Sequence, residues 1–530
     1  MSPGLKHPAW AWGLAGLYVM LGAASFADDR FLHDEGLLTH LFSLLVERDF
    51  WPAFFLQKIR PPIAVLYAPA AAVGLDAFLW MHLCVSALAV PLVAATAHRL
   101  GHAMPNVPAA VVALSPMFVA GGAAGLSNAD AVVAVSLVLW LWGAQRELVA
   151  GLALGVAVWI RAELLVLVMV MLAWAAWHKR PRAVLGLLIW PVLYGLAGAA
   201  YHDYLPWLLH YPPALSEPMP DNVYWQPHHR AASLASLAGT AVALSPAAVA
   251  LLLCRPRSLR GVERWWAGFA VAFAGALILL PRWQVFNFDQ SPRYLMPLLP
   301  VLALAVGRAV EGWGDLRRAQ IFLLVGAAAI SVAVHRGGGG FALSWATLGV
   351  SVAAAVAGAG HARAAALTLL VLLGIGPRHL GDGARIGRRT QAAALDEMVD
   401  RISDATGEGA RPVVTNEPIL AAYLSRSGLM PEVAVHYIVQ ADQVHELKAL
   451  TNPANGQRER VFAALAQGMY GTPIFPDQLS PEHLPSRALL VLTDDRRLKI
   501  VMPPAIWGPA LDTVSKSPRL TVAERKRERP

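Results

Sequence analysis

Two neighbouring carboxylates, Asp34 and Glu35, follow the first apolar run of the sequence. The residues after them, from Leu37 to Val46, have the apolar spacing of a helix. The pair therefore lies near a predicted helix amino end, where the helix dipole favours negative charge. A carboxylate there can cap the helix, and one within hydrogen-bond reach of a hydroxyl group can also act as a general base. The spacing leaves both roles open.

Basic residues that could stabilise an anionic group lie further along. Lys58 and Arg60 belong to the same segment as the acidic pair, and Arg293 directly precedes a later apolar run. Lysine and arginine bind phosphate groups through charge and hydrogen bonds. The alternative for Lys58 and Arg60 is that their charged ends reach lipid headgroups, and for Arg293 that it anchors a helix end.

Two further places carry polar residues that are unusual for their surroundings. Arg161 and Glu163 interrupt an apolar stretch from 147 to 178. Charges at membrane depth usually line a cavity or a pathway, and the alternative is a tight turn that brings both residues to the surface. His228 lies in an aromatic-rich loop, 201–230, which suits stacking on sugar rings or contact with headgroups. Histidines here lack the partners at suitable spacing that a metal site needs.

The composition shows that membrane helices must position these residues. Of 530 residues, 56% are apolar and only 15% are charged, and the mean hydropathy is +0.49. Soluble proteins carry about 25% charged residues, so an ordinary soluble enzyme, a disordered chain and a disulfide-stapled secreted domain are excluded. Cys84 and Cys254 both lie in apolar runs, which predicts neither a disulfide framework nor a zinc site.

The sequence predicts an all-α polytopic membrane protein with about thirteen transmembrane helices, each of about 20 residues or slightly fewer. The predicted spans are about 9–27, 77–98, 106–122, 128–144, 147–160, 162–178, 183–200, 231–254, 265–281, 294–310, 319–335, 341–359 and 363–377. If the amino end is cytoplasmic, every basic cluster between spans returns to the cytoplasm, as the positive-inside rule requires. The net charge of +8 then reflects membrane anchoring.

The same topology places the carboxyl-terminal region outside the cytoplasm. Residues 1–380 are predicted to form the transmembrane module, with an external loop at 28–76. Within this loop, the run 63–75 is too short to span and is predicted to lie in the interface or dip part-way into the bilayer.

Residues 381–530 are predicted to form a small α/β domain with a partly parallel sheet. Strands are expected at 410–416, 432–439 and 486–495, separated by helical patterns. No glycine-rich phosphate loop is present, so no nucleotide site is indicated. The final residues, AERKRERP, are expected to form a disordered charged tail, and their external position argues against a nucleic-acid partner.

Several motifs resemble those of the GT-C superfamily of integral-membrane glycosyltransferases. The resemblance is to the bacterial branch that contains lipid A aminoarabinose transferases, protein O-mannosyltransferases and lipopolysaccharide-sugar transferases. The motifs are Asp34-Glu35, Arg48-Asp49-Phe50-Trp51, Arg60-Pro61-Pro62-Ile63, the loop SPMFVAGGAAGLSNADAVVA with Asp130, and SPRYLMPLLPVLALAVG. Their order and spacing, over about 380 residues, carry the resemblance more than any single motif does.

The resemblance implies an enzyme that moves a sugar from a polyprenyl-phosphate donor to an extracytoplasmic acceptor at the inner membrane. It also implies that the configuration at the anomeric carbon is inverted. Asp34 would be the general base, while Glu35 and Asp130 would orient the acceptor or, with Asp34, hold a divalent metal. The substrate-binding candidates are Glu35, Lys58, Arg60, Asp130, Arg161, His228 and Arg293.

Two other classes stay open. A transporter or lipid flippase would favour two similar halves with paired charges at the bilayer midplane, which this sequence lacks. A non-catalytic GT-C-like scaffold, or an envelope-polymer polymerase, would keep the motifs and use the external domain to hold a partner. No sugar-specific motif is recognisable, so the sugar and the acceptor are not predicted.

Overall fold

The structure of the chain is a computed structural model. It describes residues 9–26, 34–47, 54–55, 59–203, 205–210, 259, 261–282, 292–310, 412–415, 421, 434–438, 472–474, 489–493, 511–516 and 520–525. The chain divides into two compact units. The first comprises Met1–Gly36, Arg60–Ile63 and Leu79–Arg388, and the second comprises Leu37–Ile59, Ala64–Phe78 and Arg389–Pro530. The predicted domain boundary at residue 380 stays a prediction, because the residues around it lie outside the described ones.

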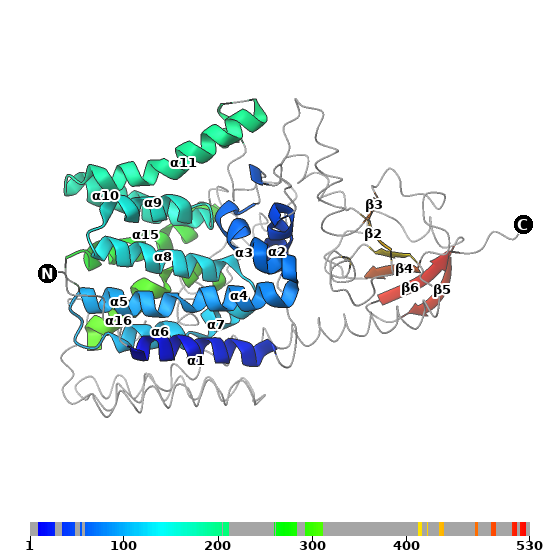
Figure 1. Ribbon diagram of the computed structural model, residues 1–530, viewed down its shortest axis with the longest axis horizontal. Helices are drawn as coiled ribbons and strands as arrows, with labels where there is room; N and C mark the ends of the chain where they lie inside the picture. Colours follow the sequence, from blue (N-terminus) through cyan, green and yellow to red (C-terminus); the bar gives the residue numbers. More distant parts are fainter. Residues whose placement is uncertain are drawn as a thin grey trace, which may run out of the picture. The chain divides into compact units, whose positions relative to one another are not determined.

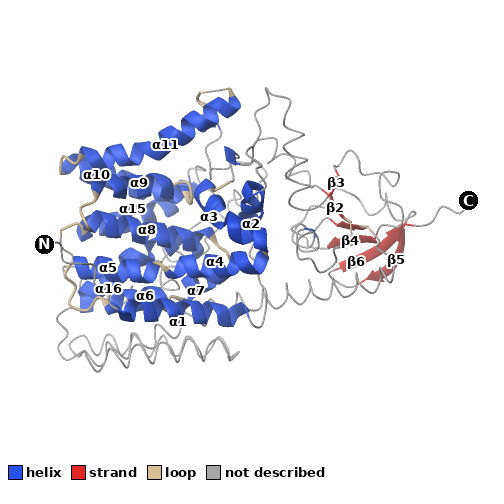
Figure 2. Cartoon of the chain, in the orientation of Figure 1, coloured by secondary structure: helices blue, strands red, loops and turns tan. Residues whose placement is uncertain are grey.

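The described elements before residue 311 are helices (Figures 1 and 2). They are α1 (Ala9–Phe26), α2 (Asp34–Glu47), α3 (Pro61–Val73), α4 (Leu75–Ala87), α5 (Ala89–Arg99), α6 (Asn106–Ala113), α7 (Pro116–Ala123), α8 (Ser127–Gly143), α9 (Glu147–Ala157), η2 (Ala162–Leu164), α10 (Leu165–Trp177), α11 (Pro181–His202), α12 (Trp207–His210), α15 (Glu263–Arg282), η5 (Pro292–Leu298) and α16 (Leu299–Val310). This helical architecture agrees with the predicted class.

Two helical segments among the described residues are long and apolar enough to cross a membrane, Asp76–Arg99 and Pro181–Tyr201. They match the predicted spans 77–98 and 183–200. A third candidate is the pair α6 and α7, which is bent by 57°. The bend follows from Pro116, because the residue before a proline avoids the helical backbone and Ser115 is extended here.

The total of thirteen spans stays a prediction. The predicted spans 231–254, 319–335, 341–359 and 363–377 lie outside the described residues. The short run at 63–75 forms most of α3, and the chain continues into α4 through Gly74, whose φ of 145° favours glycine. The position of α3 relative to a membrane also stays a prediction.

Helix α8 lies at the centre of the helical unit. It contacts α5, α7, α9, α16 and η5, and twelve of its 17 residues are buried. A helix covered on all sides should be apolar all round. Its first turn nevertheless contains buried Ser127, Asn128 and Asp130, which marks this end of the helix as chemically unusual.

Close backbone packing joins α9 to α11. A β-carbon at Gly186 would collide with the carbonyl oxygen of Leu148, and one at Gly151 with that of Ala183. Small residues allow membrane helices to approach in this way, where dispersion contacts replace the hydrophobic effect. These glycines therefore hold the α9–α11 pair at short range.

The described strands form a six-stranded sheet in the order β3-β2-β1-β4-β6-β5. The strands are β1 (Val413–Thr415), β2 (Val435–Ile438), β3 (Thr472–Ile474), β4 (Leu489–Thr493), β5 (Leu511–Lys516) and β6 (Leu520–Arg525). β1 pairs in parallel with β2 and β4, β2 pairs in parallel with β3, and β6 pairs antiparallel with β4 and β5. All three residues of β1 are buried, as expected for a central parallel strand.

Three of these strands, β1, β2 and β4, fall within the predicted segments, and the sheet is partly parallel as expected. The prediction of a disordered charged tail is wrong for its first residues, because Ala523–Arg525 belong to β6. The β-branched residues Thr521 and Val522 favour a strand, and pairing on both sides satisfies the backbone despite the charged composition.

Candidate active site

The acidic pair occupies the predicted position, since Asp34 and Glu35 are the first two residues of α2. The next residue, Gly36, packs directly on another backbone segment. A β-carbon at Gly36 would collide with the carbonyl oxygen of Ala124 and would lie 3.1 Å from that of Gly125. Glycine at this position therefore lets the start of α2 rest on the connection between α7 and α8.

That connection has a well-defined helix-ending structure. The amide of Ala124 donates to the Ala120 carbonyl at 2.9 Å, and the amide of Leu126 donates to Gly121 at 3.0 Å. Gly125 between them has a φ of 70°, the left-handed conformation that commonly ends helices at glycine. The backbone on which α2 rests is therefore held by its own hydrogen bonds.

Asp130, in the first turn of α8, is buried and bonded to a histidine. Its Oδ2 lies 3.2 Å from Nε2 of His82, a fully buried residue of α4. Nδ1 of the same imidazole lies 2.7 Å from the carbonyl oxygen of Gly122. The predicted acidic position of this loop is thus part of a histidine–carboxylate pair beside the α7–α8 connection.

Arg161 and Glu163 lie where the chain turns between α9 and α10, yet both side chains are buried. Nε of Arg161 donates to both carboxylate oxygens of Glu163 at 3.1 Å, and Nη2 also contacts Oε1. Nη1 reaches the Ser127 hydroxyl at 3.4 Å. A turn is present, as one sequence interpretation expected, but it does not bring the two side chains to the surface. Whether they line a cavity or pathway stays a prediction.

Two guanidinium groups approach a single aromatic ring, that of Tyr294 in η5. Arg161 lies 5.2 Å and Arg293 5.3 Å from the ring centroid, within the range of cation–π attraction. The ring of Tyr294 therefore lies beside two arginines from different parts of the chain. Arg161 thereby links α8, η2 and η5.

The structure thus brings some predicted site residues together and leaves others aside. Arg161 reaches Ser127 in the first turn of α8, the turn that also contains Asp130, and Arg161 and Arg293 both approach the ring of Tyr294. Arg60 is half-buried directly before α3. The remaining candidates, Lys58 and His228, lie outside the described residues, as do the side chains of Asp34 and Glu35.

Among the residues that the structure describes, no group of three or more histidine, cysteine or acidic side chains gathers to hold a metal. The described donors near Asp130 bind each other, since its Oδ2 faces His82. Hard divalent cations take six or more oxygen ligands, several of them commonly water. The divalent metal predicted with Asp34 and Asp130 stays a prediction, because the side chain of Asp34 lies outside the described residues.

His82 is the residue that sequence reasoning missed. It stands in the apolar span 77–98, and a single histidine in such a run is a usable signal, because buried polar groups in membrane helices need a partner. The partner, Asp130, lies 48 positions further along the chain, and no local pattern connects the two.

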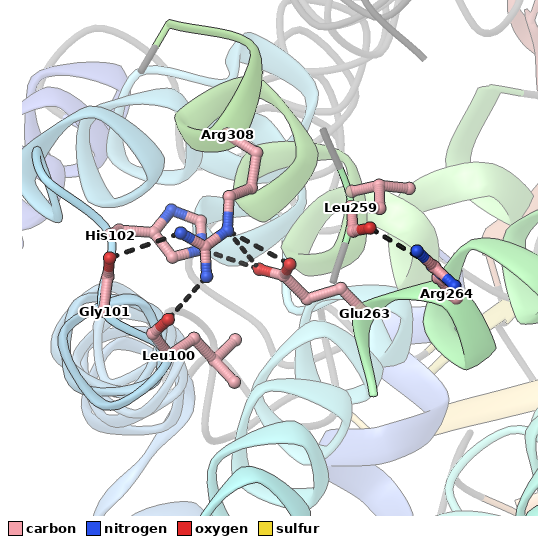
Figure 3. A network of polar contacts seen from close by, with 7 residues as sticks. All are labelled: Leu100, Gly101, His102, Leu259, Glu263, Arg264 and Arg308. Atoms are coloured by element: carbon pink, nitrogen blue, oxygen red, sulfur yellow. Dashed lines mark hydrogen bonds and ion pairs between the residues drawn. The ribbon is translucent and has the colours of Figure 1, made fainter. Parts of the chain in front are cut away.

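A second buried polar network lies elsewhere in the same unit (Figure 3). Glu263, the first residue of α15, accepts hydrogen bonds from Nε of Arg308 at 2.9 and 3.1 Å and lies 2.8 Å from Nε2 of His102. Arg308 also donates to the carbonyl oxygens of Leu100 and Gly101, just after α5. This network ties together the ends of three helices.

Comparison with solved structures gives the same architecture. The chain matches crystal structures of ArnT from Cupriavidus metallidurans bound to undecaprenyl phosphate and in the apo state. The identities are 14% and 16%, the TM-scores are 0.53 and 0.52, and each match covers 97% of this chain and 98% of the other. No protein-family model and no curated protein sequence matches the chain.

The fold is that of these ArnT structures, and ArnT is a GT-C enzyme. More particularly, the chain shares the fold of ArnT, a lipid A aminoarabinose transferase, over nearly its whole length. The relationship predicted from the motifs is therefore confirmed at the level of the fold.

Proposed function

We propose that the protein is a membrane glycosyltransferase that moves a sugar from a polyprenyl-phosphate donor to an extracytoplasmic acceptor. The observation that carries the proposal is the fold shared with ArnT across 97% of the chain. One of the matched ArnT structures is bound to undecaprenyl phosphate, which is the donor's lipid-phosphate part in this proposal. The acceptor is a glycolipid, a polysaccharide or a protein.

The proposed reaction is a single displacement at the anomeric carbon of the sugar. Asp34 takes the proton of the acceptor hydroxyl, whose oxygen attacks the anomeric carbon as the bond to the phosphate oxygen breaks. The products are the glycosylated acceptor, with inverted configuration, and the polyprenyl phosphate. A displacement of this kind needs one base, unlike the two carboxylates of a glycoside hydrolase.

Arginines supply the charge that the leaving phosphate needs. Arg293 and Arg161 lie at similar distances from the Tyr294 ring, and the charge of Arg161 is paired with Glu163. Charge stabilisation of a leaving group is often a large part of catalysis. We assign Arg293 to the lipid phosphate, with Lys58 and Arg60 as additional contacts and Glu35, Asp130 and His228 toward the acceptor.

The test is sugar transfer by membranes that contain the full-length protein, with a panel of undecaprenyl-phosphate-linked sugars. Asp34→Asn keeps the shape of the side chain and removes its basicity, so the rate should fall by about 10²–10⁴-fold. Glu47→Gln is the matched control, because Glu47 is an exposed carboxylate at the other end of α2. It should leave the rate unchanged.

Protein level and membrane insertion should be equal in the wild type and both variants. Full activity in Asp34→Asn would remove the base assignment. No transfer by the wild type from any donor of the panel would instead favour a GT-C-like scaffold without this chemistry.

A further inference from the structure

The imidazole of His82 has no part in the proposed reaction. Its side chain is fully buried within the apolar span Asp76–Arg99. A polar ring in such surroundings destabilises the fold unless hydrogen bonds replace those made with water. The hydrogen bonds of His82 are therefore the evidence for its role.

The ring contacts the ends of two helices and also the backbone of Leu126 in the connection between them. Nδ1 lies 2.7 Å from the Gly122 carbonyl oxygen, and because a carbonyl oxygen only accepts, Nδ1 carries the hydrogen. Gly122 is in the last turn of α7, where carbonyl groups lack helical partners. Nε2 lies 3.2 Å from Oδ2 of Asp130, in the first turn of α8.

His82 thus joins the end of one helix to the start of the next. Only Ala124, Gly125 and Leu126 separate α7 from α8. A displacement of this connection relative to α4 would break at least one of the two hydrogen bonds. The imidazole therefore holds the connection from the side of α4, in addition to the hydrogen bonds within the connection itself.

The same connection supports the acidic pair, since Gly36 packs on the backbone of Ala124 and Gly125. We propose that His82 is a positioning residue for Asp34, which acts by holding the α7–α8 connection through the Gly122 carbonyl. The inference rests on the proposed function, in which Asp34 is the base. In this proposal His82 acts through the connection and has no direct role in the bond-breaking step.

Two amide substitutions separate the two hydrogen bonds of the ring. The amide nitrogen of asparagine lies where Nδ1 of histidine lies, so His82→Asn keeps the donor to Gly122. The amide nitrogen of glutamine lies near the position of Nε2, so His82→Gln keeps the contact with Asp130 and loses the one with Gly122. Both variants retain a polar side chain of similar size.

We expect His82→Asn to keep kcat within about threefold and His82→Gln to lower kcat about 10-fold to 100-fold, because a misplacement of about 1 Å has effects of that order. The KM for the lipid-linked donor should change little in either variant. A purely structural role would lower the amount of folded protein in both variants without this separation in kcat.

Gly36→Ala disturbs the same contact from the α2 side. Its β-carbon displaces the start of α2 from the connection, so kcat should fall as well. Because both changes act through one contact, the double variant with His82→Gln should lose less than the product of the two single losses.

His102→Gln is the matched control. His102 is also buried and also bonded through Nε2 to a carboxylate, that of Glu263, but it belongs to the other polar network. The substitution His102→Gln should leave kcat, measured per folded molecule, and KM unchanged.

Hydrogen exchange provides a readout that needs no substrate. The amides of Ala124 and Leu126 are bonded within the connection, so they should exchange faster in full-length His82→Gln than in His82→Asn or the wild type. Equal behaviour of the two variants in exchange and kcat, or the same kcat loss in His102→Gln, would overturn the inference.

The exchange experiment also separates this inference from the proposed function. A wild type that transfers no sugar would overturn the reaction and, with it, the role of His82 in catalysis. Faster exchange in His82→Gln alone would then still establish that His82 holds the connection, and unchanged exchange would overturn that part too.

Discussion

Two polar regions of the helical unit contain similar residues in different arrangements. Around Glu263, one carboxylate receives both Arg308 and His102, and Arg308 also donates to the carbonyl groups after α5. We call this the Glu263 network. Around the start of α8, two separate pairs, His82–Asp130 and Arg161–Glu163, lie beside the backbone that supports α2. We call this the Asp34 region.

The two regions hold their buried charges in different ways, and under the proposed function only the Asp34 region takes part in the reaction. In the Glu263 network each charge lies at the helix end where the helix dipole stabilises it. The carboxylate of Glu263 is in the first turn of α15, and the guanidinium of Arg308 is in the last turn of α16. In the Asp34 region the arginines meet an aromatic ring, and the acidic pair starts a helix. The first arrangement suits a structural link, and the second suits chemistry.

The predicted topology places the Glu263 network on the cytoplasmic side and the Asp34 region outside the cytoplasm, and the test of this topology has the largest expected effect. A reporter active only outside the cytoplasm should work when fused after residue 377, and one active only in the cytoplasm should work after Arg182. The expected signals are present or absent rather than graded. A reversed signal at either fusion would contradict the predicted topology of thirteen spans.

The next prediction concerns the structural role of the Glu263 network. Glu263→Leu leaves Arg308 buried without its carboxylate, which should lower the free energy of unfolding by about 3–5 kcal/mol. Transfer per folded molecule should be unchanged. Thermal unfolding in detergent, followed by activity of the surviving fraction, measures both quantities.

Glu147→Leu is the control for that substitution. Its partner Arg180 has a side chain that is 52% exposed, so the loss should stay below about 1 kcal/mol. A similar loss of unfolding free energy in both variants would show that the Glu263 network stabilises the fold no more than an exposed ion pair does.

A smaller effect is expected at Tyr294. Arg293→Ala removes a charge that we assign to the lipid phosphate, so the KM for donor should rise about 10-fold to 100-fold, as for a lost hydrogen bond to a charged group. Arg99→Ala is the matched control, because Arg99 lies 5.8 Å from the centroid of the Trp140 ring near the Glu263 network. Equal KM values in the two variants would contradict the assignment.

The smallest effect concerns pH and lies outside both regions, in β2. Burial lowers the pKa of His436, so the unfolded chain binds a proton more strongly than the folded one. The free energy of unfolding of the carboxyl-terminal region, residues 385–530, should therefore fall as pH drops through about 6.5, the ordinary pKa of histidine. Urea unfolding of residues 385–530 at pH 7 and pH 5 measures this change.

His436→Gln should reduce that difference between the two pH values. The fragment is also predicted to be water-soluble and folded from its apolar pattern. Equal pH dependence in wild type and variant would assign the effect to other groups, and aggregated fragment would contradict separate folding.

The sequence predicted features that depend on local patterns. The start of α2 at Asp34, the spans 77–98 and 183–200 and the strand β4 all follow from apolar spacing or from end signals within a few residues. The GT-C motifs likewise pointed to the fold that the comparison with ArnT confirmed.

Features that depend on distant contacts were not predictable in this way. The pairing of His82 with Asp130, the two arginines at Tyr294 and the packing of Gly36 on Ala124 join residues far apart in the chain. The strand β6 was missed because its charged residues obscure the alternation, and only neighbouring strands show that it belongs in a sheet.

The position of β6 has a consequence for the order in which the sheet forms. In space β6 separates β4 from β5, although it follows both along the chain. A polypeptide that emerges amino end first presents β5 before the strand that pairs with it. The sheet is then completed only after residues 520–525 arrive. A nonsense codon before Leu520 would leave β4 as an unprotected edge and β5 without the strand it pairs with, and both would be open to aggregation and quality-control proteolysis.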